Sequence, residues 1–379
     1  MSADDTEQIE KPKWYQSAIW TGADLFGLVR TLHRGGWRVH PARIPDCCID
    51  LAFSVGNTSL RFLQTLVYGR QIARLTLPDD PIFVIGHWRT GTTLLHELLS
   101  LDSRHTAPTT YQCFAPNHFL LTERLLKRWT AFTLPANRPP DRVQMNWDAP
   151  QEDEFALCNL GVPSPYNTIA MPNGPLQNQE YLDLTNLSDK QVERWKTALA
   201  RFVRQVLYRS PGRLILKSPT HTCRIPTLLQ LFPKAKFIHI VRNPVVVFMS
   251  TMHLWKSLYV TQGFQHPTFE HLREQILETF LHMHFRLEQT RQRVPSDNFV
   301  NLRYEDLVAD IPGTMQRVYE SMSLGSFDEV RDDFHAYAAA KSDFQTNRYE
   351  FPPDLAHELS ERWRPYYETY GYALEDATR

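Results

Sequence analysis

A glycine-rich segment at residues 86–93 has the residue types and spacing of an anion-binding site. It follows a short apolar run, Ile82–Ile85, of the kind that forms a buried parallel strand. Leucines at helical spacing follow it and predict a helix. A strand, a glycine loop and a helix bring backbone N–H groups and the positive end of the helix dipole to one point. We therefore expect this loop to bind a phosphate or sulfate group.

The loop is related to the nucleotide-binding P-loop but departs from it in one respect. Gly86 and Gly91 have the P-loop spacing, and hydroxyl residues follow them. Threonine occupies position 92, where that motif requires lysine, and the cation Arg89 lies inside the loop instead. The residues predicted to bind the anionic ligand are Gly86, Arg89, Thr90, Gly91, Thr92 and Thr93.

A second segment carries an arginine and a serine eight residues apart, Arg242 and Ser250. Asn243 is a good helix N-cap and Pro244 suits the first helical position, so a helix is predicted to begin there. Arg242 then projects from the end of a strand, and Ser250 lies about two turns into the helix. Alone, the pair is typical of a surface arginine and a solvated serine. Next to the glycine loop, it favours a second anion site.

The two segments resemble the two signature segments of the sulfotransferase family and stand in the same order. In that family the loop holds the 5′-phosphosulfate of 3′-phosphoadenosine 5′-phosphosulfate, and the arginine and serine hold its 3′-phosphate. The resemblance implies the same roles for the loop and for Arg242 and Ser250. It also implies an in-line transfer of the sulfuryl group to a hydroxyl acceptor that needs no metal ion.

A lysine and a histidine follow the predicted strand Arg213–Lys217. Lys217 and His221 resemble the Lys-Thr-His segment of cytosolic sulfotransferases, although two additional residues separate them here. The resemblance implies that Lys217, with Arg89, stabilises charge on the leaving phosphate and that His221 removes the acceptor's proton. A histidine at a helix start also serves as a structural hydrogen-bonding group, and this alternative has nearly equal weight.

The general base has two further candidates. Carbohydrate and tyrosyl-protein sulfotransferases use a glutamate, which makes Glu152 and its acidic neighbours up to Glu154 candidates. Carboxylates at this place are also typical of a solvated helix start, where they interact favourably with the dipole. His96 on the helix after the loop is the third candidate, although a structural role suits it better.

Two weaker similarities concern the nucleotide. Tyr304, in a Tyr-Glu-Asp segment, resembles the tyrosine on the adenine side of the family's nucleotide site. The family's Arg-Lys-Gly element is missing, and Arg348 or Lys341 is predicted to substitute for it at the 3′-phosphate.

Composition narrows the classes of function. The net charge of −1 over 379 residues argues against a protein that wraps nucleic acid. The five cysteines form no Cys-x-x-Cys pair, and the first residues carry no apolar signal sequence, so a cytoplasmic location is expected. No stretch approaches the roughly 18 apolar residues of a membrane span. His282 and His284 are two apart on a predicted helix and make a poor metal pair, and no metal is expected.

The order of elements predicts an α/β fold. Residues 1–75 are predicted to be a helical N-terminal extension, and residues 76–379 an α/β domain that forms one structural unit with it. Short apolar strands at Ile82–Ile85, Arg213–Lys217, Lys236–Val241 and 298–302 alternate with helices, which predicts a parallel sheet covered on both faces, the three-layer α/β/α arrangement. Residues 107–185 are predicted to be irregular, with proline-rich loops at 134–141 and 161–175 that cover the acceptor.

The sequence thus predicts a sulfotransferase that uses 3′-phosphoadenosine 5′-phosphosulfate. The acceptor, a small molecule or glycan with a hydroxyl group, is left open among carbohydrate, lipid, phenol and peptide, and so is the oligomeric state. A P-loop kinase or nucleotide hydrolase that depends on magnesium is one alternative. A nucleotide-binding homologue without catalysis is another, suggested by the spacing of Lys217 and His221.

Overall fold

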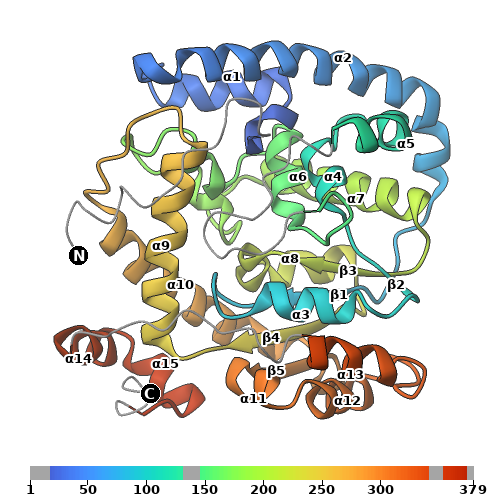
Figure 1. Ribbon diagram of the computed structural model, residues 1–379, viewed down its shortest axis with the longest axis vertical. Coiled ribbons are helices and arrows are strands. Elements are labelled where there is room, and N and C mark those ends of the chain that lie inside the picture. Colours follow the sequence, from blue (N-terminus) through green and yellow to red (C-terminus); the bar gives the residue numbers. More distant parts are fainter. Residues whose placement is uncertain (1–17, 131–145, 341–352, 374–379) are drawn as a thin grey trace. The chain divides into compact units, whose positions relative to one another are not determined.

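The computed structural model describes residues 18–130, 146–340 and 353–373 (Figure 1). They form two compact units, here called the helical unit and the sheet unit. The described residues of the helical unit fall in Met1–Leu77, Ala107–Gly212 and His253–Glu270, and those of the sheet unit in Pro78–Thr106, Arg213–Met252 and His271–Arg379. The predicted boundary at residue 75 lies close to the first change of unit; the division into an extension and a domain stays a prediction.

The sheet unit is built on a parallel sheet with the strand order β2-β3-β1-β4-β5. Its strands are β1 (Ile82–Ile85), β2 (His105–Thr106), β3 (Arg213–Lys217), β4 (Lys236–Val241) and β5 (Phe299–Arg303). β1 lies between β3 and β4 and is apolar throughout, because a central parallel strand is covered on both faces. The predicted ranges of β1, β3 and β4 are confirmed, β5 begins one residue later than predicted, and β2 was not predicted.

The order of the strands explains where a ligand can bind. After β1 the chain continues to β2, toward one lateral edge of the sheet, whereas after β3 it continues to β4, toward the opposite lateral edge. The direction of winding therefore reverses at β1. In parallel sheets ligands bind at such a reversal, outside the carboxyl ends of the strands. The ends of β1, β3 and β4 are where the glycine loop, Lys217 and Arg242 lie.

Helices cover both faces of this sheet. They are α3 (Thr92–Leu99), α8 (Ile225–Leu231), the first half of α9 (Pro244–Gln262), α10 (Leu272–Thr290), α11 (Tyr304–Ala309), α12 (Ile311–Met322), α13 (Arg331–Ala340), α14 (Pro353–Arg362) and α15 (Arg364–Tyr370). Right-handed crossovers in opposite directions place α3 and α8 on opposite faces. α10 packs with α8, while Tyr337 of α13 hydrogen-bonds Glu97 of α3 (2.8 Å). The predicted three-layer α/β/α fold is confirmed.

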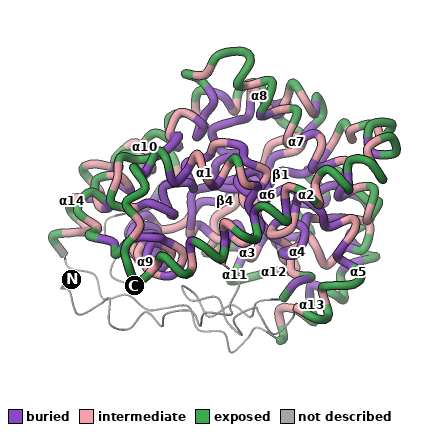
Figure 2. The backbone as a smooth tube through the Cα atoms, turned by 90° about the horizontal axis from the view of Figure 1, so that it is seen from above, coloured by how far each residue is buried: buried purple, intermediate pink, exposed green. Residues whose placement is uncertain are grey.

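The interior of the sheet unit is aromatic as well as aliphatic. Strands β1, β3 and β4 belong almost entirely to the buried part of the chain, drawn in purple in Figure 2, whereas β5 is only half-buried. The ring of Phe83 in β1 stacks on that of Phe237 in β4, with centroids 5.3 Å apart, and lies 5.7 Å from the ring of Phe232. This cluster fixes which face of β1 points toward α8.

The helical unit contains no named strand in its described residues. Its helices are α1 (Leu25–Arg34), α2 (Ile44–Arg74), α4 (Thr110–Phe114), α5 (Phe119–Trp129), α6 (Asp153–Asn159) and α7 (Asp189–Arg209), and the second half of α9. α1 and α2 lie within the predicted helical N-terminal extension, which as a division of the chain stays a prediction. The prediction of an irregular stretch at 107–185 was partly wrong, because three short helices, α4 to α6, interrupt it. The proline-rich residues 134–141 lie outside the described residues.

Three simple features of the described residues bear on function. All five cysteines are free thiols, of which Cys48 is exposed and the others are buried. In the described parts of the chain no helix has the length and apolar character needed to cross a membrane. Among the same residues, no cluster of three or more histidine, cysteine, aspartate or glutamate side chains could hold a metal ion.

Candidate active site

The glycine loop takes a backbone path that only glycine allows at two positions. Gly86 has φ +149° and Gly91 has φ +106°. A Cβ atom at Gly86 would lie 2.6 Å from the carbonyl oxygen of Ile240, and one at Gly91 would lie 2.4 Å from the ring of Tyr304. These short distances show that the loop backbone lies directly against the end of β4 and the start of α11. Both glycines are therefore required by the turn and by the close approach of neighbouring elements.

Hydroxyl groups hold the loop in this shape. Thr90 Oγ1 donates to the carbonyl of His87 (2.8 Å) and closes the turn. Thr222 Oγ1 accepts from the amide of Gly86 (2.9 Å) and donates to the carbonyl of the same residue (3.1 Å). Thr222 belongs to a short 3-10 helix, Pro219–Cys223, that follows β3. Its contribution was not predicted, since nothing in its local sequence points to residue 86.

The start of α3 is open to an anion. Gly91 is the N-cap of α3 and has no side chain with which to occupy the first amides. The first turn of α3 carries no acidic residue that could take the place of a ligand. Thr92, which is buried, and Thr93, which is half-buried, are the first two residues of α3 and so lie at the positive end of the helix dipole. The predicted loop residues thus form one cradle of amides and hydroxyls.

The two predicted anion sites are joined by arginine. Arg89 Nε donates to Ser250 Oγ (2.7 Å), which connects the loop to α9. Arg242 Nη1 donates to the carbonyl of Arg89 (3.2 Å), and the Arg242 guanidinium lies 4.1 Å from the ring centroid of Tyr304. Arg89 adopts a left-handed backbone conformation with φ +70°, which costs a non-glycine residue about 1–2 kcal/mol. The contacts of Arg242 and Ser250 hold it there.

Further contacts fix the turn in which Arg242 lies. Asn243 Oδ1 accepts from the amide of Val245 (3.0 Å), which confirms the predicted N-cap of α9. The hydroxyl of Tyr366, in α15, bonds the amide of Arg242 (3.2 Å) and its carbonyl (3.1 Å). Burial is the main factor that raises the pKa of Tyr366, so it is neutral and serves as both donor and acceptor. Sequence reasoning missed Tyr366, because it is 124 residues away from Arg242.

Lys217 lies at the end of β3, opposite Val84 of β1, and is 1% exposed. Burial, together with the charge of Lys217, lowers the pKa of His96 well below its usual value. His96 is fully buried on α3, and neither of its ring nitrogens has a hydrogen-bond partner among the described residues. The predicted cation and the third candidate base therefore interact electrostatically.

His221 packs against an aromatic side chain of the core. Its ring is fully buried and meets the ring of Phe83 edge-on, with centroids 5.4 Å apart. Phe83 belongs to the aromatic cluster on the α8 face, and the 3-10 helix of His221 packs against α10. The role of His221 as a base stays a prediction.

The acidic candidates lie at the start of α6 in the helical unit. Glu152 is the N-cap residue and is half-buried, and its Oε2 accepts from the hydroxyl of Tyr166 (2.7 Å). Glu154 is fully buried, and its Oε1 accepts from Ser164 Oγ (2.5 Å). The Tyr166 ring also contacts Phe155 and Trp255. Glu152 is thus a carboxylate that accepts a hydrogen bond from a tyrosine of an aromatic cluster.

Two predicted nucleotide contacts are not described. Arg348 and Lys341 both lie outside the described residues, so their substitution for the missing family element stays a prediction. Tyr304, in contrast, is placed beside Gly91 and Arg242, within the predicted site.

Comparison with known proteins gives a consistent result. The family model described as "Sulfotransferase family" matches residues 81–329. Over 367 residues the chain is 41% identical to omega-hydroxy-beta-dihydromenaquinone-9 sulfotransferase Stf3 of Mycobacterium bovis and of Mycobacterium tuberculosis, covering 97% of this chain and 94% of each relative.

Two crystal structures share the fold. Sulfotransferase STF9 from Mycobacterium avium superposes with a TM-score of 0.69 at 20% identity, over 97% of this chain and 96% of that one. Sulfotransferase STF1 from Mycobacterium tuberculosis has a TM-score of 0.61 at 18% identity, over 91% and 94% of the two chains.

Proposed function

Because this chain belongs to the sulfotransferase family, as its two signature segments predicted, we propose that it transfers a sulfuryl group from 3′-phosphoadenosine 5′-phosphosulfate to a hydroxyl group of an apolar lipid. The observation that carries the donor assignment is the chain of contacts Ser250–Arg89–Arg242. It joins the cradle for one anionic group to a second cationic site on the same sheet edge. A ligand with charged groups at both ends of one nucleoside fits such a pair.

Each group has a distinct part in binding the donor. The amides at the start of α3, with Arg89, Thr92 and Thr93, hold the 5′-phosphosulfate. Arg242 and Ser250 hold the 3′-phosphate, and Tyr304, on which Arg242 stacks, lies on the adenine side. Charge-assisted hydrogen bonds contribute about 1.5–3 kcal/mol each, so two of them would distinguish this donor from adenosine phosphates that lack a 3′-phosphate.

The reaction is a single displacement at sulfur. The acceptor oxygen forms a bond to sulfur as the bond between sulfur and the 5′-phosphate oxygen breaks, and the nucleotide bisphosphate leaves with that bond's electron pair. Lys217, with Arg89, stabilises the negative charge that develops on the leaving oxygen. Fixed cations in a buried site are effective because they need no reorganisation during the reaction.

For the proton of the acceptor we favour Glu152 over His221 and His96. A carboxylate half-buried against Tyr166 has a fixed orientation, whereas His221 packs against the core ring of Phe83. The low pKa of His96 makes it a weak proton acceptor. We expect Glu152→Gln to lower kcat/KM by about 10²–10⁴-fold and His221→Asn to lower it much less. The opposite ranking would assign the proton transfer to His221.

The acceptor class rests on the relatives. Stf3, 41% identical over nearly the whole chain, is named for a hydroxylated dihydromenaquinone, an isoprenoid quinone. The aromatic cluster beside Glu152, formed by Phe155, Tyr166 and Trp255, has the apolar character that such an acceptor requires. We therefore propose an isoprenoid carrying a terminal hydroxyl as the acceptor.

The experiment is a transfer assay with the purified full chain, the sulfate donor and a panel of hydroxylated lipids, phenols, sugars and peptides. We expect a mass gain of about 80 Da, one SO₃ group, on the hydroxylated isoprenoid, with no loss of activity in a chelator. The Lys217→Ala variant is the negative control. Transfer of phosphate from Mg-ATP, abolished by the chelator, would instead identify a kinase.

A further inference from the structure

Helix α2 presents its polar side chains to the protein and its apolar side chains to the surface. Its buried residues are Cys47, Asp50, Ser54, Asn57, Gln64 and Ile72, four of them polar or charged. The exposed large side chains of the same helix include Phe53, Phe62 and Leu66, which are 54%, 71% and 83% exposed. An ordinary surface helix has the reverse arrangement, with its apolar stripe against the core.

Specific hydrogen bonds hold α2 in this orientation. Asn57 Nδ2 donates to the carbonyls of Thr21 (2.8 Å) and Ala23 (3.0 Å), and its Oδ1 bonds His118 Nε2 (3.0 Å). Gln64 Oε1 accepts from the amide of Leu120 at the start of α5 (2.9 Å). Rotating the helix to bury its apolar stripe would break all of these bonds, each of which involves a buried or part-buried group. The outward apolar face is therefore built into the helical unit.

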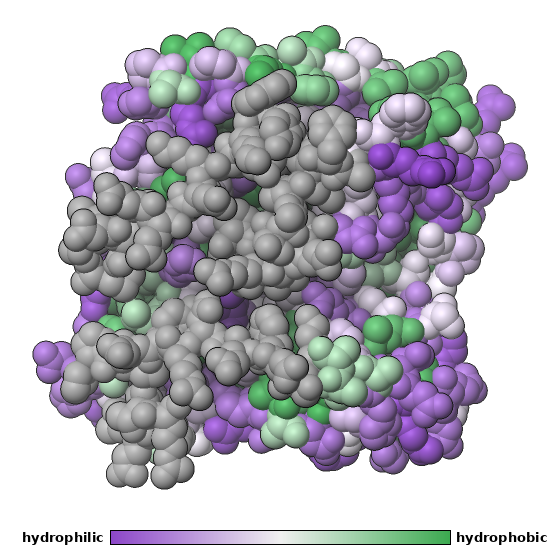
Figure 3. All heavy atoms as spheres, in the orientation of Figure 1, coloured by the Kyte–Doolittle hydropathy of each residue, from purple (hydrophilic) through white to green (hydrophobic). Residues whose placement is uncertain are grey.

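The outward face of α2 is mainly apolar over more than five turns. From residue 48 to residue 67, all of which the structure describes, the charged residues are Asp50, which is buried, and Arg61, which is 34% exposed and pairs with Asp24. The large exposed apolar residues of this stretch are Ile49, Phe53, Val55, Phe62, Leu63, Leu66 and Val67. We call these seven residues the α2 apolar face. In Figure 3 hydrophobic residues gather along the upper edge, where Figure 1 places α1 and α2. Exposed apolar patches of this extent mark sites of contact with a protein or a membrane.

Basic residues border this face. Phe62, Leu66, Arg70 and Arg74 follow one another at intervals of four, so the row that begins apolar ends in two exposed arginines. α5, which binds α2 through Gln64, exposes Leu125 and Trp129 together with Arg124 and Arg128. The charged residues that are exposed rather than half-buried on α1, α2 and α5 are all arginines. An apolar face bordered by arginine is complementary to a lipid surface with anionic headgroups.

We propose that the α2 apolar face, with the arginines of α2 and α5, docks this enzyme on the surface of a lipid bilayer that contains anionic lipids. The proposal rests on the proposed function in one respect, because an isoprenoid acceptor resides in a bilayer. α2 lies flat in the headgroup region, its apolar side chains at the acyl boundary and its arginines among the phosphates. A second copy of the chain is the competing occupant of this face.

Binding to vesicles tests the proposal without donor or acceptor. We expect the full chain to float with vesicles of phosphatidylcholine containing about 30% phosphatidylglycerol, and much less with phosphatidylcholine alone. Combined substitution of Phe53→Ser, Phe62→Ser and Leu66→Ser is expected to weaken binding to the mixed vesicles at least about tenfold. Phe285→Ser is the matched control, since Phe285 is an exposed phenylalanine (45%) on α10 of the sheet unit; it is expected to bind as the wild type does.

Cys48 provides a readout on the native face. It is the exposed member of the five cysteines and lies on α2 beside the apolar face, so a polarity-sensitive fluorophore reports there directly. A blue shift on addition of mixed vesicles supports docking. Failure of the wild type to bind either kind of vesicle overturns the proposal. It is also overturned if light scattering shows a dimer that the triple substitution dissociates, while vesicles leave the fluorophore unchanged.

A separate assay distinguishes this proposal from the proposed function. With a short-chain hydroxylated isoprenoid in solution, the triple variant is expected to retain wild-type activity, and with the long-chain acceptor in vesicles to lose most of it. If the protein binds vesicles through α2 but sulfates neither acceptor, only the proposed function fails.

Discussion

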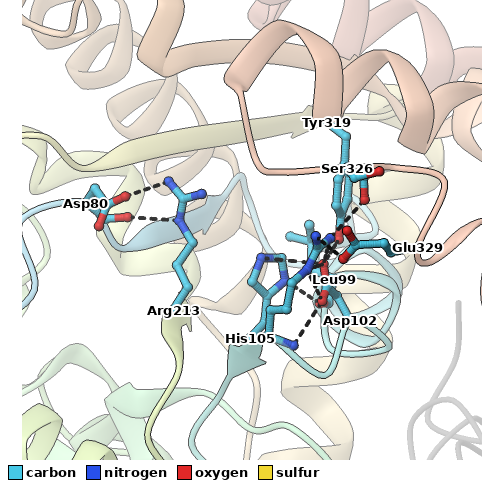
Figure 4. A network of polar contacts seen from close by, with 9 residues as sticks. Asp80, Leu99, Asp102, His105, Arg213, Tyr319, Ser326 and Glu329 are labelled. Atoms are coloured by element: carbon cyan, nitrogen blue, oxygen red, sulfur yellow. Dashed lines mark hydrogen bonds and ion pairs between the residues drawn. The ribbon is translucent and has the colours of Figure 1, made fainter.

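The two edges of the same sheet use arginine for opposite purposes. At the amino edge, before β2 and at the start of β3, arginines bond carboxylates: Arg104 Nη2 lies 2.6 Å from Asp102 Oδ2, and Arg213 Nη2 lies 2.8 Å from Asp80 Oδ2 (Figure 4). At the carboxyl edge, Arg89 bonds a serine hydroxyl, and Arg242 bonds a carbonyl and stacks on a tyrosine ring. Contacts of both kinds orient a guanidinium, the first through carboxylates and the second through a hydroxyl, a carbonyl and an aromatic ring.

The electrostatics at the amino edge are those of a structural ion pair. Burial opposes ionisation of Asp102, but hydrogen bonds from Arg104, the nearby His105 and the hydroxyl of Tyr319 together lower the pKa of Asp102 to about 2. Tyr319 donates to Asp102 from α12 (2.9 Å), and Arg104 also bonds Glu329 and the carbonyl of Ser326. The ion pair thus fastens α12 and the segment after it to the start of β2. The carboxyl edge serves ligand binding and catalysis in the function proposed here.

Among the changes at the two edges of the sheet, Lys217→Ala is expected to have the largest effect. Loss of a fixed cation aimed at the leaving oxygen is expected to lower kcat by about 10²–10³-fold while the melting temperature changes little. Steady-state kinetics and thermal unfolding measure the two. Lys234→Ala is the control, because Lys234 is exposed and pairs with Asp79 away from the carboxyl edge. Equal, small losses in both variants would contradict the catalytic role of Lys217.

The second largest expected effect is a loss of folding stability at acid pH, caused by buried histidines near the carboxyl edge. Burial lowers the pKa of His87, in the loop, to about 4, whereas the unfolded chain protonates it near 6.5. Between these values the unfolded state binds more protons, so stability falls as the pH falls, by roughly 3 kcal/mol at pH 4. His239 and His87 line one small cavity together, and burial lowers the pKa of His239 to about 4 as well, which adds to the loss.

Thermal unfolding from pH 7 to pH 4.5 measures this loss. His87→Asn is expected to lose less stability over the range than the wild type does. Asp102→Asn lowers stability at every pH but is expected to keep the wild-type slope, because the pKa of Asp102, about 2, lies below this range. A His87→Asn slope identical to that of the wild type would show that His87 is not a source of the acid sensitivity.

Arg242→Ala is expected to weaken binding of 3′-phosphoadenosine 5′-phosphate by about 10–100-fold, with a smaller change in kcat. Isothermal titration calorimetry measures the affinity. Arg317→Ala, an exposed arginine on α12, is the matched control and is expected to bind normally. Unchanged affinity in the Arg242 variant would show that Arg242 does not bind the 3′-phosphate.

The smallest effect is expected from Arg104→Ala at the amino edge. It takes the guanidinium away from the buried Asp102, which keeps the hydrogen bond from the Tyr319 hydroxyl (Figure 4), at a cost of about 1–2 kcal/mol in the free energy of unfolding. Nucleotide affinity is expected to stay unchanged. Arg331→Ala, which removes an exposed pair with Asp328, is expected to cost less than about 0.5 kcal/mol. A weakened affinity for the nucleotide in the Arg104 variant would mean that the two edges are coupled.

Features set by a few neighbouring residues could be predicted from the sequence. The ranges of β1, β3 and β4 follow from short apolar runs, and the start of α9 from Asn243 and Pro244. Gly86 and Gly91 mark the loop because positive φ angles favour glycine wherever they occur. Contacts between distant segments could not be predicted in this way. Thr222 and Tyr366 are ordinary residues in their own surroundings, and β2 is too short to have a pattern of its own.

By itself, the sequence determined strands β1, β3 and β4, the glycine loop, the N-cap of α9 and hence the family, because these depend on apolar periodicity and on the backbone preferences of single residues. Only the tertiary structure decided that Arg89 joins the loop to Ser250, that Tyr366 holds the Arg242 turn, and that α2 faces outward with its apolar side. Those outcomes depend on which hydrogen bonds form between segments far apart in the chain. Which face of α2 turns toward the protein is decided by the buried partners of Asn57 and Gln64. These partners lie in other segments, so the periodicity of α2 itself does not predict them.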